Sequence, residues 1–153
     1  SPAVQARQRM DQLELPSQLT MASLLDYVSD LRCRPIEIIE TSLLNGRPVC
    51  GLWVPDEEKE RIFHAESRGQ LHRQQLILHE LSHMLLRHDL HDAVNWQGLA
   101  AFRHLSTEQV NRALARGRFN TIEEVVAEEL ADLLAAALRE APHEIAGLEE
   151  VFE

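Results

Sequence analysis

Two histidines and a glutamate near the middle of the chain have the types and spacing of a metal-assisted hydrolytic site. His79, Glu80 and His83 read as HExxH. On a helix the two histidines lie on one face, about 6 Å apart along the axis, so both imidazoles can reach one metal ion. Zinc lowers the pKa of a bound water to about 7, and the carboxylate of Glu80 can take its proton and pass it to a leaving amine. A shuffled chain would contain HExxH roughly one time in twenty, so the motif needs support from its surroundings.

A catalytic zinc requires a third protein ligand and an open fourth position. The local pattern HExxHxxGxxH is disfavoured, because Leu86 replaces its glycine and Asp89 its last histidine. A distant alternative lies in TIEEVVAEELADLLAAALR, where Glu124, Glu128 and Asp132 share one helical stripe. One carboxylate there could ligate, while its neighbour four residues on holds a ligating histidine through the other ring nitrogen. The alternative is a solvated acidic face, but the HExxH upstream favours ligands.

The spacing of apolar residues predicts an α+β fold around these residues. Helical periodicity indicates helices from Thr20 to before Pro35, from Gln70 through HExxH, over 106–117 and from Thr121 to near Pro142, with an irregular stretch over 91–103. The runs 35–40, 48–55 and 61–66 have the composition of short strands, and Asn45-Gly46 is typical of a hairpin turn. We therefore expect a small three-stranded antiparallel sheet packed against the HExxH helix and further helices.

Length and composition favour one domain that does not bind nucleic acid directly. The chain has 153 residues, 44% of them hydrophobic, and a formal charge of −10, whereas phosphate binding requires clustered cations. Residues 1–16 are polar with weak periodicity, so we predict a loose N-terminal arm or tag remnant there and a single domain over 17–153. Without an apolar run of about 18 residues or a signal-like start, we expect a cytoplasmic protein without membrane contact. Cys33 and Cys50 are expected to be reduced.

Four segments together resemble the ImmA/IrrE-type metallopeptidase family. They are GLWV, RIFHAE, LHRQQLILHELSHMLLRH and ARGRFNTIEEVVAEELADLLAAAL. In the last segment Glu124, Ala127, Glu128 and Ala131 match a family pattern of Glu, two residues, Ala, Asn or an acid, two residues, Ala. The resemblance covers residues 20–139. Ser82 departs from it, because the family usually has glycine at that place.

The resemblance implies a zincin-like fold, a Zn²⁺ cofactor and peptide hydrolysis. Carried over residue by residue, it implies His79, His83 and Glu124 as zinc ligands, Glu80 as general base and Glu128 as a residue that supports a ligand. Members of the family are cytosolic proteases that cut helix-turn-helix (Xre-like) repressors encoded nearby, which relieves transcriptional repression under stress. The acidic charge of this chain is compatible with such a basic partner.

Several alternatives stay open at this point. The loop before the late helix is long, so Glu123 and Glu128 remain candidates for the third ligand. His64 could stabilise an oxyanion if its strand lines the cleft, because edge strands of such proteases hold extended substrate. His72, a further candidate for substrate contact, is too far from His79 to share an ion, so a structural or rim role is favoured. The rival function is a zinc-binding sensor that controls a transcription regulator without proteolysis.

Overall fold

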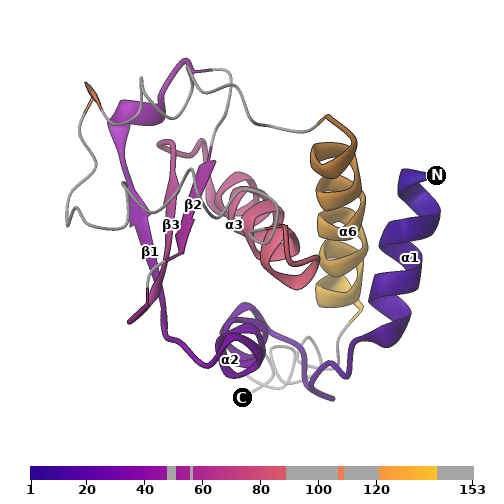
Figure 1. Cartoon of the computed structure of the whole chain (residues 1–153). Helices are drawn as coiled ribbons and strands as arrows, with labels where there is room; N and C mark the ends of the chain where they lie inside the picture. Colours follow the sequence, from indigo (N-terminus) through magenta and orange to yellow (C-terminus); the bar gives the residue numbers. More distant parts are fainter. Residues whose placement is uncertain (48–50, 56, 89–106, 109–120, 141–153) are drawn as a thin grey trace, which may run out of the picture.

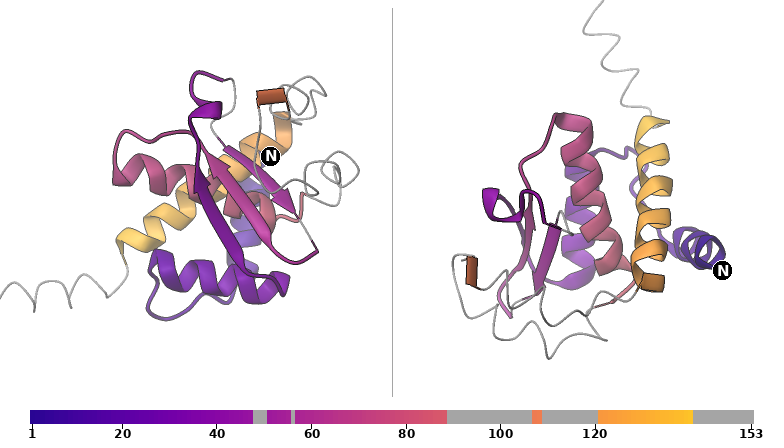
Figure 2. Two further views of the ribbon diagram at one scale, coloured as in Figure 1. Left: turned by 90° about the vertical axis from the view of Figure 1, so that its left-hand side faces the viewer. Right: turned by 90° about the horizontal axis from the view of Figure 1, so that it is seen from above.

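Helices and a three-stranded sheet form the described part of the chain, which is residues 1–47, 51–55, 57–88, 107–108 and 121–140 of this computed structural model. The sheet, α3 (Gln70–Leu85), α6 (Thr121–Arg139) and α1 (Pro2–Gln12) lie one behind another, and α2 (Met21–Arg32) packs against α3 (Figure 1; Figure 2). The hydrophobic core joins α3 and α6 through fully buried residues, among them Leu78, Leu81, Leu130 and Leu134. The α+β class expected from the sequence is therefore confirmed.

The sheet is mixed, so the expectation of an antiparallel sheet is wrong. Its strands are β1 (Ile36–Glu40), β2 (Gly51–Pro55) and β3 (Glu60–His64), in the order β1-β3-β2. β3 pairs antiparallel with β2 but parallel with β1. All five residues of β3 are buried, and a strand covered on both faces takes the centre of a sheet.

The predicted hairpin at Asn45-Gly46 is also wrong, because β1 and β2 are not neighbours. After β1 the chain makes a short 3₁₀ helix, η1 (Ser42–Leu44), and Gly46 then turns with φ at +71°, a value that favours glycine. The Asn45 side chain is held by Glu66: its Nδ2 donates to the carboxylate at 2.6 Å, and its Oδ1 accepts from the backbone N–H at 2.9 Å. The turn is thus fixed to the end of β3.

Residues 2–12 form α1, so the expectation of a loose arm is wrong for them. Ser1 caps the helix by accepting from the backbone N–H of Val4, and proline occupies its first position. α1 runs along α6, where Ala6 is fully buried (Figure 1). α1 also contacts α3: Arg9 Nε donates to the carbonyl of Leu85, the last residue of α3, 2.7 Å away. A few apolar residues on a polar helix suffice for this packing, which explains the weak periodicity.

The other predicted helices have mixed outcomes. α2, α3 and α6 confirm the helices expected from Thr20, Gln70 and Thr121. The irregular stretch over 91–103 and most of the short helix over 106–117 lie outside the described residues.

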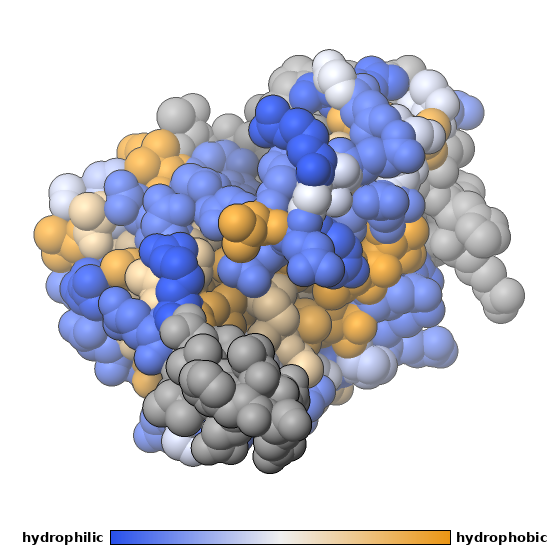
Figure 3. Space-filling model, turned by 180° about the vertical axis from the view of Figure 1, so that it is seen from behind, coloured by the Kyte–Doolittle hydropathy of each residue, from blue (hydrophilic) through white to orange (hydrophobic). Residues whose placement is uncertain are grey.

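Figure 3 shows mainly hydrophilic side chains on the back of the molecule, with apolar patches between them. Among the helices that can be described, none combines the length and apolar character needed to cross a membrane.

Candidate metal centre

The two histidines of HExxH converge on one point beside α6. One helical turn separates them on α3, and their Nε2 atoms lie 3.2 Å apart, with the rings edge-to-face. The His79 side chain is 20% exposed and that of His83 is 12% exposed. α3 and α6 pack side by side (Figure 1), so the two imidazoles face α6 from a partly buried position.

Glu124 brings its carboxylate from the first turn of α6 to both imidazoles. Its Oε1 lies 3.3 Å from Nε2 of His79, and its Oε2 lies 2.6 Å from Nε2 of His83. These three side chains form a group that could hold a metal ion, with the ligand atoms within 4.8 Å of one another. In a tetrahedral zinc site with bonds of about 2.0–2.1 Å, ligand atoms are separated by about 3.3 Å. The two Nε2 atoms, 3.2 Å apart, are close to that separation, and each lies near a different oxygen of Glu124.

Hydrogen bonds at the outer ring nitrogens orient both imidazoles. Nδ1 of His79 lies 2.7 Å from Oε2 of Glu128, a carboxylate that also accepts from Gln75. With Nδ1–H donating to Glu128, Nε2 of a neutral His79 carries a lone pair directed at the centre. Nδ1 of His83 lies 2.7 Å from Nδ1 of His88, and with His83 as donor its Nε2 presents a second lone pair. The lone pairs of both Nε2 atoms and the carboxylate of Glu124 are then directed at one point, as a bound cation requires.

The pKa shifts of His79 and Glu124 also indicate that the centre favours positive charge. Burial lowers the pKa of His79, but hydrogen bonds to Glu124 and Glu128 outweigh it and raise the pKa to about 10. Burial raises the pKa of Glu124, but hydrogen bonds with His79 and His83 outweigh it and lower the pKa to about 2. Without a metal, a proton on His79 supplies the positive charge. A metal ion would replace that proton among the same atoms.

Glu80 stands beside this centre, turned toward the sheet. It is 6% exposed. Burial raises the pKa of its carboxyl, and the nearby His79 and His83 only partly offset this. Gly51, the first residue of β2, lies against it: a Cβ on Gly51 would come within 2.7 Å of Oε2 of Glu80. The glycine therefore leaves room for the carboxylate, a role that the sequence analysis missed although GLWV contains this residue.

The structure distinguishes the three glutamates that were candidates for the third ligand. Only Glu124 places carboxylate oxygens beside both Nε2 atoms. Glu128 contacts the outer nitrogen of His79. The Glu123 carboxylate lies 3.7 Å from Nε2 of His88, on the far side of that ring. His88 itself was missed as a neighbour of the site, because no pattern in the sequence links it to His83.

Among the described residues, the contacts of His64 and His72 are made away from the two Nε2 atoms. His64 is fully buried, with Nδ1 2.7 Å from the carbonyl of Ala65 and Nε2 without a hydrogen bond. Complete burial gives no support to contact between His64 and a substrate oxyanion. His72 accepts the backbone N–H of Arg68 at 3.0 Å through its Nδ1. Because Gly69 offers no side-chain cap to α3, His72 stabilises the start of that helix, in line with its favoured structural role.

Ser82, within HExxH, is fully buried, and its hydroxyl has no hydrogen-bond partner in the structure. Comparison of the chain with protein-family models, curated proteins and solved structures gives no match.

Proposed function

We propose that this chain is a zinc-dependent endopeptidase in which His79, His83 and Glu124 hold the metal. The observation that carries the proposal is that Glu124, from a second helix, reaches both inner imidazole nitrogens while Glu80 stands beside them. Three ligands on the described residues leave a fourth position for water or substrate, as in catalytic sites. A structural zinc would be closed by four protein ligands and would have no use for a buried carboxylate at Glu80.

Each residue around the centre has a defined task in this proposal. Zinc, when bound, supplies a Lewis acid that polarises a peptide carbonyl and makes water more acidic. Glu80 accepts the proton of the attacking water and delivers it to the departing amine; its raised pKa suits that exchange. Glu128 holds His79 through Nδ1, which keeps the other nitrogen directed at the metal. Gly51 leaves space for Glu80 to occupy this position.

The substrate class that we propose is a helix-turn-helix repressor, as the family resemblance implies. Two properties of the chain support a protein substrate of this kind. β2 is at the edge of the described sheet and begins at Gly51, beside Glu80, so an extended peptide added along β2 would pass the catalytic carboxylate. The formal charge of −10 also favours encounter with a basic DNA-binding protein.

The test is to incubate the purified zinc-loaded chain with a helix-turn-helix repressor chosen from the genes beside its own and to identify fragments by mass spectrometry. Glu80→Gln should retain zinc, measured by elemental analysis, and lose cleavage. The matched control is Glu129→Gln, at an exposed position of α6, which should keep both. Cleavage by Glu80→Gln at the wild-type rate would refute the assignment. Stable binding of the regulator with no cleavage by the wild type would instead support the rival function, a zinc-binding sensor.

A further inference from the structure

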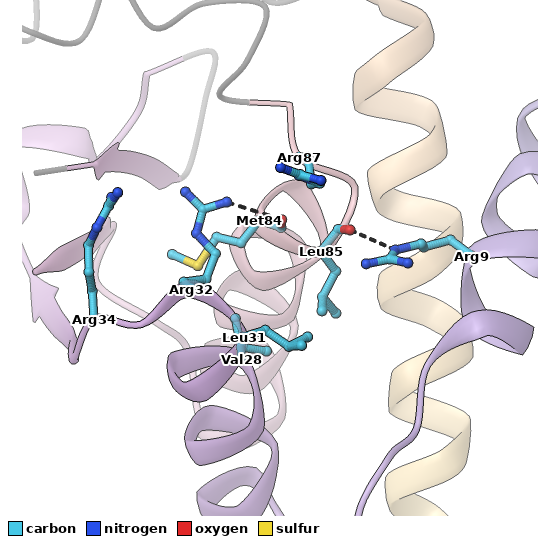
Figure 4. A pocket seen from close by; sticks show the side chains of 8 residues that line it. All are labelled: Arg9, Val28, Leu31, Arg32, Arg34, Met84, Leu85 and Arg87. Atoms are coloured by element: carbon cyan, nitrogen blue, oxygen red, sulfur yellow. Dashed lines mark hydrogen bonds between the residues drawn. The ribbon is translucent and has the colours of Figure 1, made fainter. Parts of the chain in front are cut away.

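A second candidate site lies at the C-terminal end of α3, in a pocket of about 430 Å³. Four arginines line it: Arg9, Arg32, Arg34 and Arg87. Arg9 belongs to α1 and Arg32 is the last residue of α2. Arg34 precedes β1, and Arg87 follows α3. Figure 4 shows the four side chains along the lining of the pocket. None of the proposed metal ligands lines this pocket. It is therefore separate from the metal centre, although both adjoin α3.

The charge of the pocket is unusual for this chain. The whole sequence has 15 Lys+Arg against 25 Asp+Glu, yet four of the cations surround one cavity. Arg32 and Arg34 share one oxygen of the buried Glu60, at 2.8 and 3.2 Å. Arg9 donates to two neutral groups, the carbonyl of Leu85 and the side-chain oxygen of Gln12. Among the contacts given for the described residues, these two guanidiniums share one carboxylate, and Arg9 and Arg87 add two further cations.

Capping of α3 explains only part of this cluster. Arg9 and Arg32 donate to the last carbonyls of α3, those of Leu85 and Met84, where cations complement the helix dipole. The side chains of Arg34 and Arg87 make no such contact among the described residues, although the backbone N–H of Arg87 donates to the carbonyl of Met84 at 3.0 Å. In the described part of the chain, the Arg87 side chain has no hydrogen bond or ion pair, and its backbone is left-handed with φ at +60°. Glycine or asparagine is usual at such a position after a helix, so an arginine there is held at a cost in free energy.

The other described residues that line the pocket are apolar. Val28 and Leu31 come from α2, and Met84 and Leu85 come from α3 (Figure 4). A volume of this size lies in the range of pockets that hold small molecules. Guanidinium groups bind carboxylates and phosphates through paired N–H donors, while apolar walls accept hydrocarbon. A lining of arginines and apolar side chains favours a ligand with a negatively charged group and a hydrocarbon part.

We propose that this pocket binds a small organic anion, with a carboxylate or phosphate head at the arginines and a short apolar body against α2. Arg87 contacts the head, because its side chain has no partner among the described residues, and Arg34, which shares Glu60 with Arg32, adds its remaining donors. The ligand would meet α3 at Met84, directly after His83 in the sequence. The site stands or falls independently of peptidase activity, since binding can be measured on the chain without zinc.

The probes are octanoate, octyl phosphate, inorganic phosphate and the neutral octanamide, titrated into the full chain by calorimetry and followed by thermal melting. We expect octanoate or octyl phosphate to bind and to raise the melting temperature, and the tighter of the two identifies the head group. Octanamide should bind at least tenfold more weakly, because it lacks the charge. Binding of octanamide as tight as that of octanoate would overturn the role of the arginines. Inorganic phosphate as tight as octyl phosphate would overturn the role of the apolar walls.

Two variants test the arginines, and in the second of them Arg32 and Trp53 still contact Glu60. Arg87→Gly should leave the free protein at least as stable, because glycine suits a positive φ, yet weaken the bound probe about tenfold or more. Arg34→Gln should weaken it similarly. The matched control is Arg73→Gln, at an exposed position of α3 away from the pocket, which should bind as the wild type does. Equal affinity in the wild type and both pocket variants, or no binding of any charged probe at millimolar concentration, would refute the proposal.

Discussion

Gly51→Ala should impair catalysis without removing any metal ligand. The added methyl group would lie 2.7 Å from Oε2 of Glu80. Ordinary contact begins near 3.4 Å, so the carboxylate must retreat by about 0.7 Å. Displacements of about 1 Å in a catalytic group reduce rates by about 10²-fold. We expect cleavage of the repressor to slow by about 10- to 100-fold.

The stability of Gly51→Ala should change little, because two effects oppose each other. Forcing the Glu80 side chain off its preferred rotamer costs about 0.5–1.5 kcal/mol. Replacing glycine by alanine restricts the unfolded chain and contributes about 0.4–1 kcal/mol of stability. Urea unfolding of the zinc-free protein should therefore show a free energy of unfolding within about 1 kcal/mol of the wild type.

A double-mutant cycle shows whether the alanine acts through Glu80. In a Glu80→Ala background no carboxylate meets the new methyl group, so Gly51→Ala should then stabilise the protein slightly. Zinc affinity, measured by competition with a chromophoric chelator, should be unchanged by Gly51→Ala alone. Cleavage by Gly51→Ala at the wild-type rate would show that the methyl group does not displace Glu80. A loss of zinc that accounts for the lost activity would show that it acts on the metal ligands instead.

Three further perturbations address the metal centre and the fold. Glu128→Gln should weaken zinc binding about 10- to 100-fold in the same chelator competition, because it removes the charge that holds the outer nitrogen of His79; unchanged affinity would exclude that role. In zinc-free protein, the pKa of His79, raised to about 10 from 6.5, gives stability that is full below pH 6.5 and is lost as the pH rises to 10. The pKa of Glu124, lowered to about 2 from 4.5, gives stability present above pH 4.5 and lost as the pH falls to 2. Melting temperatures should therefore be highest between pH 4.5 and 6.5, and a flat profile from 6.5 to 10 would contradict the His79 contacts. Glu60→Ala should cost about 3–5 kcal/mol in urea unfolding, because it leaves two guanidiniums and a buried indole without their acceptor; a change as small as that of the exposed Glu57→Ala would show that the network contributes little.

Local periodicity predicted the helices of the fold but not the order of its strands. A helix is recognised from neighbours three and four residues apart, and α2, α3 and α6 follow that spacing. The place of β3 between β1 and β2 depends on which strand can be covered on both faces, which is a property of the whole molecule. α1 was missed for a related reason: its few apolar residues stabilise it by packing against other helices, which the sequence of α1 alone does not show.

The candidate site was predictable where its residues share a helix. The spacing of His79 and His83 shows that they can face one point, and Glu124 was found from its own stripe and from the family resemblance. Gln75 lies four residues before His79 on α3, so the same helical spacing places it on the face of the two histidines. His88 and Gly51 reach the site only through a turn and through strand packing, so no local pattern identifies them. The arginine pocket is the extreme case, because its four cations come from four separate segments.

α1 braces the two helices that carry the candidate ligands. It lies along α6 through the buried Ala6, and Arg9 joins it to the last carbonyl of α3. The alignment of His79 with Glu124 is thus supported by a third helix that contributes nothing to the ligand set. If the centre holds a metal as proposed, an arriving ion would find its ligands in place and would spend little of its binding free energy on ordering the chain. The polar first twelve residues would then contribute to metal affinity without contacting the metal.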